Sequence, residues 1–515
     1  MSDVRADIEF TNDLFDAANK MRGSVAPSEY KHYVLPLIFL RYLSNKYEQR
    51  RAAIRDMIND PNSDWYTPDK EMQEEMLSDV DLYKAENVFV LPEKARWPYI
   101  MKNAKQPNIK EILDNAMAAI EEANPELEGI LPRIYQESNL PPENVSGLIE
   151  IFSRDVFSSN RSDSVDILGR TYEYFIGSFA AAEGNRGGEF FTPSSIVKLL
   201  VAMLEPLEGT VFDPACGSGG MFIQSEDYTP HKNSLSFYGQ ENVTTTVRLG
   251  KMNVLLHGIN ADIRLGDSLL NDQFPGMEFD FVISNPPFNM RDWGAERISK
   301  NDPRLIGPVT NSNANYMWMQ HFLYHLKEGG TAGYVMANGA MTTNLSGEKE
   351  VRQKLVDQGY VDCIVQLPDK LFFTTGIPCC LWFLSKNRDG QKGFRERKNE
   401  ILFIDARKMG HLVSRKQRAL SKEEIKEIAD VYHAYRNRNG QYEDRAGFCK
   451  VATIEEVRNN DYKLTPGIYV GTEVSNEDDV SFEEKMAELT QRLLEQFEES
   501  NRLQEKIKMD LEELM

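Results

Sequence analysis

The first candidate for chemistry is a glycine-rich turn that opens with an acid, Asp213-Pro214-Ala215-Cys216-Gly217-Ser218-Gly219-Gly220. It lies between a short β-type run and a helical segment, and glycine there lets the backbone approach a ligand closely. Phe222 replaces the third glycine of a dinucleotide fingerprint and the lysine of a phosphate loop is missing, so neither NAD nor ATP is supported. The carboxylate of Asp213 instead suits a ligand that carries an ammonium and a sulfonium group, as S-adenosylmethionine does.

Two further acids follow the next two β-type runs. Glu241 comes shortly after the run 235–238, a place where an acid commonly binds ribose hydroxyls. Asp267 closes the following run and is well placed to reach an adenine ring. Each acid by itself is more often a turn residue or a helix cap, but with the glycine turn they favour one nucleoside-binding rim.

The second motif is Asn285-Pro286-Pro287-Phe288, directly after the apolar run 280–284. The prolines remove backbone donors and stiffen the turn, which leaves the side-chain oxygen of Asn285 and the carbonyl of Pro286 as outward acceptors. Two acceptors suit an NH2 group, because they orient its lone pair toward a methyl donor and stabilise the charge that grows on nitrogen. Phe288 would stack on a base extruded from duplex DNA. A proline-rich turn with a packing Phe is the alternative, which the neighbouring rim disfavours.

Three regions must position these residues. Up to about residue 162, apolar residues recur at intervals of three and four, which predicts a helical domain at 1–162. After residue 188, β-type runs alternate with helical segments as in a parallel α/β sheet, and we expect a Rossmann-like catalytic domain at 163–474. The expected strands are 210–212, 235–238, 262–265, 280–284, 331–336, 360–366 and 378–384, with helices at 219–226 and 243–257.

Two segments near the C-terminus stand out by composition. Residues 386–418 carry eleven Lys or Arg against four acids, which indicates a basic connector that either contacts phosphate or is a solvated loop. The tail at 475–515 has a capping box at 481–484, followed by a narrow apolar stripe. Such a stripe is typical of a helix that packs against a partner, with docking on its own chain as the alternative. The stripe consists of Phe482, Met486, Leu489, Leu493, Leu503, Ile507 and Leu514.

The composition of the 515 residues excludes several classes of protein. With 41% hydrophobic and 27% charged residues the chain is in the globular range, and we expect a cytoplasmic protein without membrane span or signal peptide. Five scattered cysteines indicate neither disulfides nor a zinc site, and Cys216 is interpreted as a packing residue. His321 and His325 lie four apart without an evident third ligand, so no metal site is expected. The net charge of −21 opposes attraction to a phosphate backbone unless a basic patch or a partner intervenes.

The chain resembles the modification subunits of type I restriction-modification systems, which methylate adenine N6 in DNA. The resemblance covers nearly the whole chain. It rests on Lys20-Met21-Arg22-Gly23, Glu29-Tyr30-Lys31, Gly188-Glu189-Phe190-Phe191-Thr192-Pro193, the turn at Asp213, the Asn285 motif and the helical tail. The order of these motifs looks like the gamma arrangement of amino-methyltransferases, and Asn rather than Ser at position 285 favours adenine over cytosine.

The resemblance implies S-adenosyl-L-methionine as cofactor and a set of residues that hold it. Asn285, Pro286 and Phe288 would be catalytic. The cofactor would be bound by Glu189, Phe190, Phe191, Thr192, Pro193, Ser194, Asp213, Gly217, Ser218, Gly219, Gly220, Glu241 and Asp267. Thr192 and Pro193 are also explained as a helix N-cap followed by proline at the first helical position, and Phe190 and Phe191 could equally belong to the core.

The implied partners are DNA, a specificity subunit that reads the target and a motor-nuclease restriction subunit, with two modification subunits for each specificity subunit. Delegated recognition would explain the acidity of this chain. Two alternatives remain. The Asn285 motif recognises an amino or amide nitrogen without reporting what bears it, so RNA or a protein glutamine is a possible substrate. A non-catalytic scaffold that binds cofactor within a nuclease complex is the alternative from another class.

Overall fold

The structure is a computed structural model of the chain. It describes residues 29–161, 163–183, 192–372, 376–391, 393–414 and 417–472, and in the tail residues 486, 490–498 and 500–504. Several predicted residues lie outside this described part: Glu189, Phe190, Phe191, the motif at 20–23, the capping box at 481–484, and the tail residues Leu489, Ile507 and Leu514.

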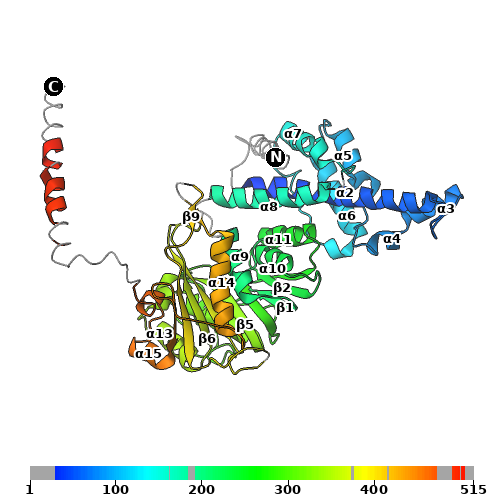
Figure 1. Cartoon of the computed structure of the whole chain (residues 1–515). Helices are drawn as coiled ribbons and strands as arrows, with labels where there is room; N and C mark the ends of the chain where they lie inside the picture. The colour runs from blue at the N-terminus through cyan, green and yellow to red at the C-terminus, as the bar shows by residue number, and fades with distance from the viewer. Residues whose placement is uncertain are drawn as a thin grey trace, which may run out of the picture.

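The described chain up to residue 183 is helical, as its apolar spacing predicts. The long helix α2 lies alongside α8, and the shorter helices surround them (Figure 1). The apolar stretch from Val34 to Leu43 in α2 is almost completely buried, which accounts for its composition. The helices are α2 (Tyr30–Asn59), α3 (Lys70–Ser78), α4 (Val80–Lys84), α5 (Trp97–Asn103), α6 (Ile109–Ala123), α7 (Pro142–Phe152) and α8 (Ser164–Glu183).

A nine-stranded sheet with the strand order β11-β8-β6-β7-β5-β4-β1-β2-β3 forms the second region. Its strands are β1 (Gly209–Asp213), β2 (Leu235–Glu241), β3 (Ala261–Leu265), β4 (Phe279–Ser284), β5 (Leu326–Ala337), β6 (Val361–Gln366), β7 (Cys379–Ser385), β8 (Glu400–Asp405) and β11 (Cys449–Thr453). All seven expected strands are present. The sheet is mixed rather than parallel, however, because β7 runs antiparallel to β5 and β6, and β11 runs antiparallel to β8. Residues 367–372 and 376–378, the described part of the connection from β6 to β7, contain no helix, and only antiparallel neighbours can be joined without a crossover.

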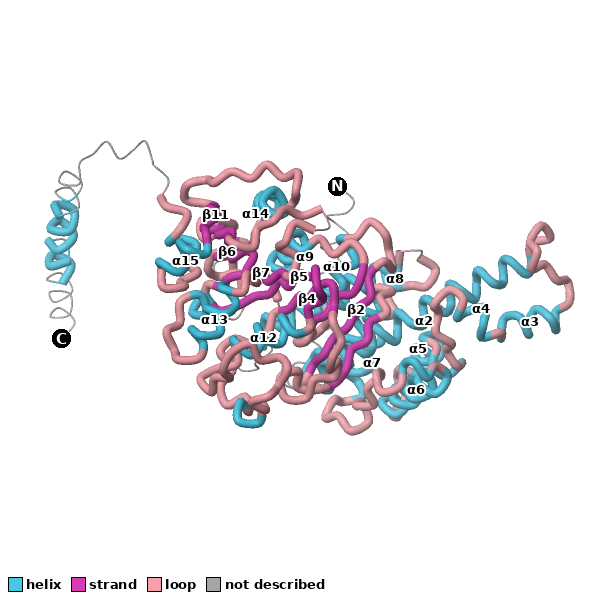
Figure 2. Tube along the Cα trace, turned by 90° about the horizontal axis from the view of Figure 1, so that it is seen from below, coloured by secondary structure: helices cyan, strands magenta, loops and turns pink. Residues whose placement is uncertain are grey.

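Helices cover both faces of this sheet. Figure 2 shows the strands between α12 and α13 on one side and α9, α10 and α14 on the other. Neighbouring residues of one strand therefore enter different cores: Tyr334 packs with the α12 side and Val335 with the α9 side. The helices are α9 (Ser194–Leu204), α10 (Gly220–Tyr228), α11 (Thr244–Leu256), α12 (Asn315–Tyr324), α13 (Glu348–Asp357), α14 (Lys422–Arg436) and α15 (Ile454–Asn459). The predicted Rossmann-like α/β class with a helical N-terminal region is confirmed.

The helical region and the sheet region meet at α11. Leu249, Met252 and Leu256 of this helix belong to the same hydrophobic core as α2 and α8. The hydroxyl of Tyr172 in α8 donates to the carbonyl of Leu249 at 3.1 Å, and the hydroxyl of Tyr42 in α2 donates to Leu255 at 3.2 Å. The two regions are thus joined by a shared core.

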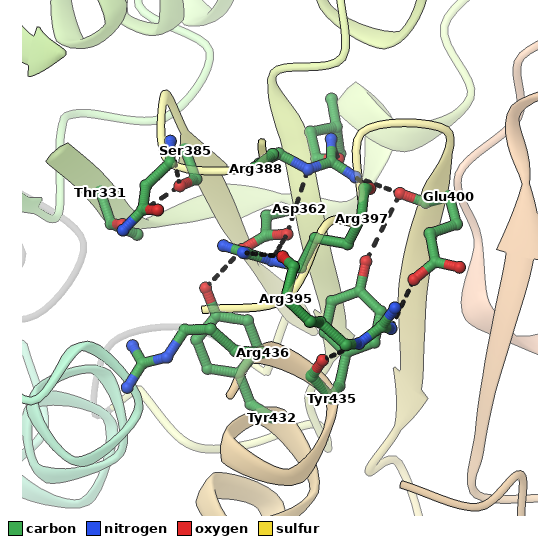
Figure 3. Close-up of polar contacts among 12 residues, drawn as sticks. Thr331, Asp362, Ser385, Arg388, Arg395, Arg397, Glu400, Tyr432, Tyr435 and Arg436 are labelled. Atoms are coloured by element: carbon green, nitrogen blue, oxygen red, sulfur yellow. Dashed lines mark hydrogen bonds and ion pairs between the residues drawn. The ribbon is translucent and has the colours of Figure 1, made fainter. Parts of the chain in front are cut away.

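The structure corrects one part of the interpretation of residues 386–418 as a basic connector, while phosphate contact by the other basic residues of the segment stays a prediction. The segment contains β8, and two of its arginines, Arg388 and Arg397, are buried against Asp362 of β6 (Figure 3). Arg397 donates to both carboxylate oxygens at 2.8 and 3.0 Å, Arg388 Nε lies 3.2 Å from Oδ1, and the hydroxyl of Tyr432 donates at 2.8 Å. Burial alone would raise the pKa of Asp362, but Arg397 and Arg388 hold it below its usual value. These positive charges neutralise a buried acid and are not available to phosphate. The segment also contributes β9 (His411–Leu412), which pairs with β10 (Arg418–Ala419).

The described part of the tail is helical, and its apolar side chains are about half exposed. They are Met486, Leu493, Leu494, Phe497 and Leu503. Within the described residues, no helix combines the length and the apolar character that crossing a bilayer requires.

Candidate functional site

A cavity of about 930 Å³ opens at the carboxyl ends of four neighbouring strands. The strands lie in the order β4-β1-β2-β3, so the chain runs in one direction from β1 to β3 and crosses back to place β4 on the other side of β1. In open α/β sheets, ligands bind where the strand order reverses in this way. The two sequence motifs follow β1 and β4, and therefore flank this reversal point.

The glycine turn after β1 brings backbone to the cavity wall. Gly217 and Gly219 have φ angles of 52° and 78°, in the left-handed region that favours glycine. A Cβ at Gly219 would also lie only 2.9 Å from Cγ1 of Val254, so the turn packs directly on α11. Gly217, Ser218 and Gly220 line the cavity, whereas Gly219 does not. The predicted contribution through backbone is thus compatible with three of these four residues.

Asp213 lines the cavity but is almost completely buried. Its Oδ1 accepts hydrogen bonds from the Ser284 hydroxyl at 2.7 Å and from the Ala215 N–H at 3.0 Å. Burial raises the pKa of Asp213 to about 7, the two hydrogen bonds oppose that rise, and the nearby Glu241 adds to it. A positive ligand charge in this cavity would restore the ionised form.

Glu241 and Asp267 line the same cavity, and the carboxylates of both also accept hydrogen bonds from backbone N–H groups. Oε1 of Glu241 accepts from the N–H groups of Asn242 and Val243, and Oε2 accepts from Gly217 at 3.3 Å. Oδ1 of Asp267 accepts from the N–H groups two and three residues further on, at 3.0 and 3.2 Å. Both acids therefore have the role of turn residues that was considered from the sequence, and neither caps a helix, because Val243 is the N-cap of α11 and residues 267–278 contain no helix. This role does not exclude ligand binding, since each carboxylate has about four acceptor sites.

Asn285 follows β4 and faces the glycine turn across the reversal point. Its side-chain NH2 donates to the hydroxyl of Thr192 at 2.9 Å, and Thr192 also lines the cavity. The amide oxygen Oδ1 is shielded from water and has no hydrogen-bond partner among the described residues. A buried acceptor without a partner costs about 1–3 kcal/mol, so its presence at a cavity wall calls for an incoming donor.

The other residues of this motif are divided between the cavity and the core. Phe288 lines the cavity and contacts Phe372 edge-on, with ring centroids 5.9 Å apart. Pro287, which was not predicted as a site residue, lines the cavity as well, whereas Pro286 is buried and does not line it.

At the start of α9 the predicted cap is displaced by one residue. Pro193 takes the N-cap position and the helix begins at Ser194, so Thr192 is not the cap. Pro193 is buried, Ser194 is exposed, and neither lines the cavity.

One wall of the cavity comes from the helical region, and this wall was not predicted from the sequence. Lys31, His32 and Leu35 of α2 and Ile176 of α8 line it together with the motif residues. The α2 residues lie more than 150 positions before the motif residues in the chain, so no local pattern predicts this contact. Trp318 of α12 completes the lining on the sheet side, and its sequence context gave no separate signal.

The histidine pair of α12 acquires a third neighbour in the structure. Asp272, His321 and His325 offer potential ligand atoms that all lie within 4.8 Å of one another, so the structure brings the two histidines together with an acid that was not evident from the sequence. The contacts present are hydrogen bonds: His325 Nε2 lies 3.1 Å from Asp272, and His325 Nδ1 lies 2.7 Å from the carbonyl of Met277.

Cys216 is buried in the glycine turn next to Asp213. Burial raises the pKa of its thiol far above the usual value, with Asp213 adding to the effect. A thiol that stays protonated is a poor nucleophile. The packing role predicted from its position agrees with this environment.

The fold and the placement of its motifs define a Rossmann-like methyltransferase as the class of protein. Residues 163–478 match the family described as N-6 DNA Methylase, and residues 10–152 match the HsdM N-terminal domain. The first match alone covers more than half of the chain, so the chain belongs to the N-6 DNA methylase family.

Individual relatives specify the group further. The chain is 42% identical over 521 residues to the methylase subunit of the type I restriction enzyme MjaIX of Methanocaldococcus jannaschii, covering 98% of this chain and 91% of that one. It is 41% identical over 447 residues to the HindI methylase subunit of Haemophilus influenzae, covering 82% and 99%. The crystal structure of a type I methyltransferase subunit from Streptococcus thermophilus matches with a TM-score of 0.74 at 25% identity, covering 90% and 99%. These matches place the chain among the methylase subunits of type I restriction-modification systems and confirm the resemblance.

Proposed function

We propose that this chain transfers a methyl group from S-adenosyl-L-methionine to N6 of an adenine extruded from a specific DNA site, and so protects host DNA from cleavage. The observation that carries the proposal is the Asn285 side chain. It presents an acceptor without a partner at a cavity whose other strand ends supply a glycine turn and three acids. An exocyclic amine provides the donors that this acceptor needs.

The cavity residues suit the proposed cofactor. The backbone at Gly217, Ser218 and Gly220 allows close approach, Glu241 and Asp267 suit the ribose and the adenine, and Asp213 suits the positive charge. Glu189, Phe190 and Phe191 remain expected neighbours of the methionine end. When bound, the cofactor supplies an electrophilic methyl group on its sulfonium.

The protein residues then act on the target amine. Thr192 holds the NH2 end of the Asn285 amide, which leaves Oδ1 to accept a hydrogen from the adenine amine. The carbonyl of Pro286 would accept the second hydrogen, and the two bonds would stabilise the charge that develops on nitrogen. Because Oδ1 is shielded from water here, its exposure must increase as the base enters. Stacking on Phe288, worth about 1–3 kcal/mol, would offset part of the cost of extruding the base.

The test is transfer of a radiolabelled methyl group to DNA, RNA and protein by the full chain, with a specificity subunit supplied. We expect label in DNA adenine only, and none without the specificity subunit. Label in RNA or in a protein glutamine would support the alternative substrates. Cofactor binding without transfer to any substrate would support the scaffold.

Partners follow from the family and from the tail. We propose that residues 163–474 carry catalysis, and that the helix within 475–515 assembles with the specificity subunit, two modification subunits binding one such subunit and a restriction subunit joining them. The support is the row of half-exposed apolar side chains that includes Leu493, Phe497 and Leu503.

Removing residues 481–515 should impair co-purification with the specificity subunit while cofactor affinity stays normal. The matched control replaces the exposed Arg492 with Lys and should assemble normally. Normal co-purification of the truncated chain would contradict the assembly role.

A further inference from the structure

A buried arginine outside the sequence motifs lies directly behind the cavity wall. Arg304 belongs to the segment between the Asn285 motif and α12, and it is only 8% exposed. All five N–H groups of its guanidinium have acceptors. Nε donates to Asp302 Oδ1 at 2.9 Å, Nη1 to the Ser268 carbonyl at 3.2 Å and to His321 Nδ1 at 3.3 Å, and Nη2 to the Leu269 carbonyl at 2.9 Å and to Asp302 Oδ2 at 2.7 Å.

The two carbonyls belong to the turn that carries Asp267. Asp267 and Ser268 line the cavity, and the Ser268 hydroxyl donates to the carbonyl of Pro214 at 2.5 Å, which ties this turn to the glycine turn. Arg304 therefore holds from behind a piece of backbone whose front surface faces the proposed cofactor. No other natural side chain offers five donors in a planar fork, so lysine cannot reproduce the set.

His321 completes the support. A guanidinium can only donate, so Nδ1 of His321 must be the acceptor, and its Nε2 then carries the hydrogen. Burial lowers the pKa of His321 well below its usual value, which keeps the ring neutral and able to accept. The same bond argues against a metal at the Asp272 cluster, because the protonated Nε2 has no lone pair to offer. The ring also lies edge-on to Trp318, another residue of the cavity wall.

We propose that Arg304 is a positioning residue for the cofactor, which fixes the turn at 266–270 so that Asp267 and Ser268 present one rigid wall to the nucleoside. The inference rests on the proposed function and deepens it, since it assigns part of the cofactor affinity to a side chain that does not line the cavity. Arg304 follows the Asn285 motif in the chain and donates hydrogen bonds to the turn after β3. It therefore links the target side of the site to the cofactor side.

The test is the variant Arg304→Lys in the full chain. We expect the dissociation constants of S-adenosylmethionine and S-adenosylhomocysteine, measured by calorimetry, to rise about 10- to 100-fold, because the lysine ammonium keeps the charge but cannot hold both carbonyls, His321 and Asp302 together. In the complex with the specificity subunit, KM for the cofactor should rise similarly, while kcat at saturating cofactor stays within about threefold. A merely structural role would not separate KM from kcat.

The matched control is Arg297→Lys, an exposed arginine of the same segment, which should leave both constants unchanged. Normal cofactor affinity of Arg304→Lys beside a wild type that binds would overturn this inference alone. Failure of the wild type to bind either nucleoside would overturn the proposed function and this inference with it. A lower kcat with unchanged affinity would also contradict the positioning role.

A second variant keeps the proposal testable if Arg304→Lys does not fold. Asp302→Asn retains the arginine but weakens the charge that orients it, and it should raise the cofactor dissociation constant in the same direction by a smaller factor. Unchanged affinity in this folded variant would count against Arg304.

Discussion

Two buried aspartates in the same sheet have opposite environments. Asp213 ends β1, accepts bonds from a hydroxyl and a backbone N–H, and has its pKa raised to about 7 by burial. Asp362 lies in β6, is held by Arg388, Arg397 and Tyr432, and has its pKa lowered by the arginines despite complete burial. Burial alone therefore does not set the charge of an acid. One half of the sheet surrounds its acid with neutral hydrogen-bond donors, at the place where we propose that a positive ligand binds, and the other half neutralises its acid internally.

The largest effect is expected where the internal neutralisation is removed. Asp362→Asn would leave two buried guanidinium groups without their anion, and we expect a loss of about 3–5 kcal/mol in the free energy of unfolding. Denaturant titration measures it. Asp262→Asn, which breaks the surface pair with Arg264, is the control and should cost about 1 kcal/mol or less. An equal loss of unfolding free energy in the two variants would contradict the expected difference between the buried carboxylate of Asp362 and the exposed carboxylate of Asp262.

In the half of the sheet that carries the proposed site, the next effect is on turnover rather than on stability. Asn285→Ala removes the acceptor that we propose for the target amine, and we expect kcat for methyl transfer to fall at least about 100- to 1000-fold, as for loss of one preorganised polar group. Cofactor affinity, measured by calorimetry, should stay within error because Asn285 acts on the other substrate. Asn301→Ala, at an exposed position in the following segment, should leave turnover unchanged. Wild-type turnover in Asn285→Ala would refute the assigned role.

The smallest effect is a pH dependence of cofactor affinity. Below about pH 7 the carboxyl of Asp213 is neutral and cannot attract a positive ligand, and above pH 7 it is ionised. Affinity should therefore rise by about tenfold from pH 6 to pH 8, with release of a proton on binding. Calorimetry in two buffers of different ionisation enthalpy measures the proton. Asp213→Asn should bind more weakly and lose this slope, and an unchanged slope would assign the titration to another group.

Much of the fold could be predicted from the sequence because its signals are local. Seven strands were located from short apolar runs, and the helices after β1 and β2 from their spacing. β8 and β11 were missed for different reasons. β8 lies within a segment whose many basic residues predict a solvent-exposed loop. Two of them, Arg388 and Arg397, instead form buried ion pairs with Asp362 of β6, and no local pattern in the sequence predicts that contact. β11 has five residues and lies at the sheet edge, so its pattern is too short to stand out.

In the candidate site, too, the residues marked by local sequence signals could be predicted and those brought together by long-range contacts could not. The residues at the strand ends could be predicted to converge, because parallel strands bring their carboxyl ends to one edge. The wall from α2, the support by Arg304 and the approach of Asp272 to the histidine pair could not, since each joins residues that are distant in the chain. The sequence also did not show which of the two adjacent prolines lines the cavity, and the structure shows that Pro287 does and Pro286 does not.

α11 belongs to two cores at once, and this sets a limit on how the chain can be divided. Cutting the chain at residue 192 would leave the apolar side of that helix, with Leu249, Met252 and Leu256, facing water. A truncated methyltransferase fragment should therefore aggregate unless those three positions are redesigned. Exchange of the first 183 residues between relatives would likewise require a compatible α11, so the two portions are constrained to evolve together.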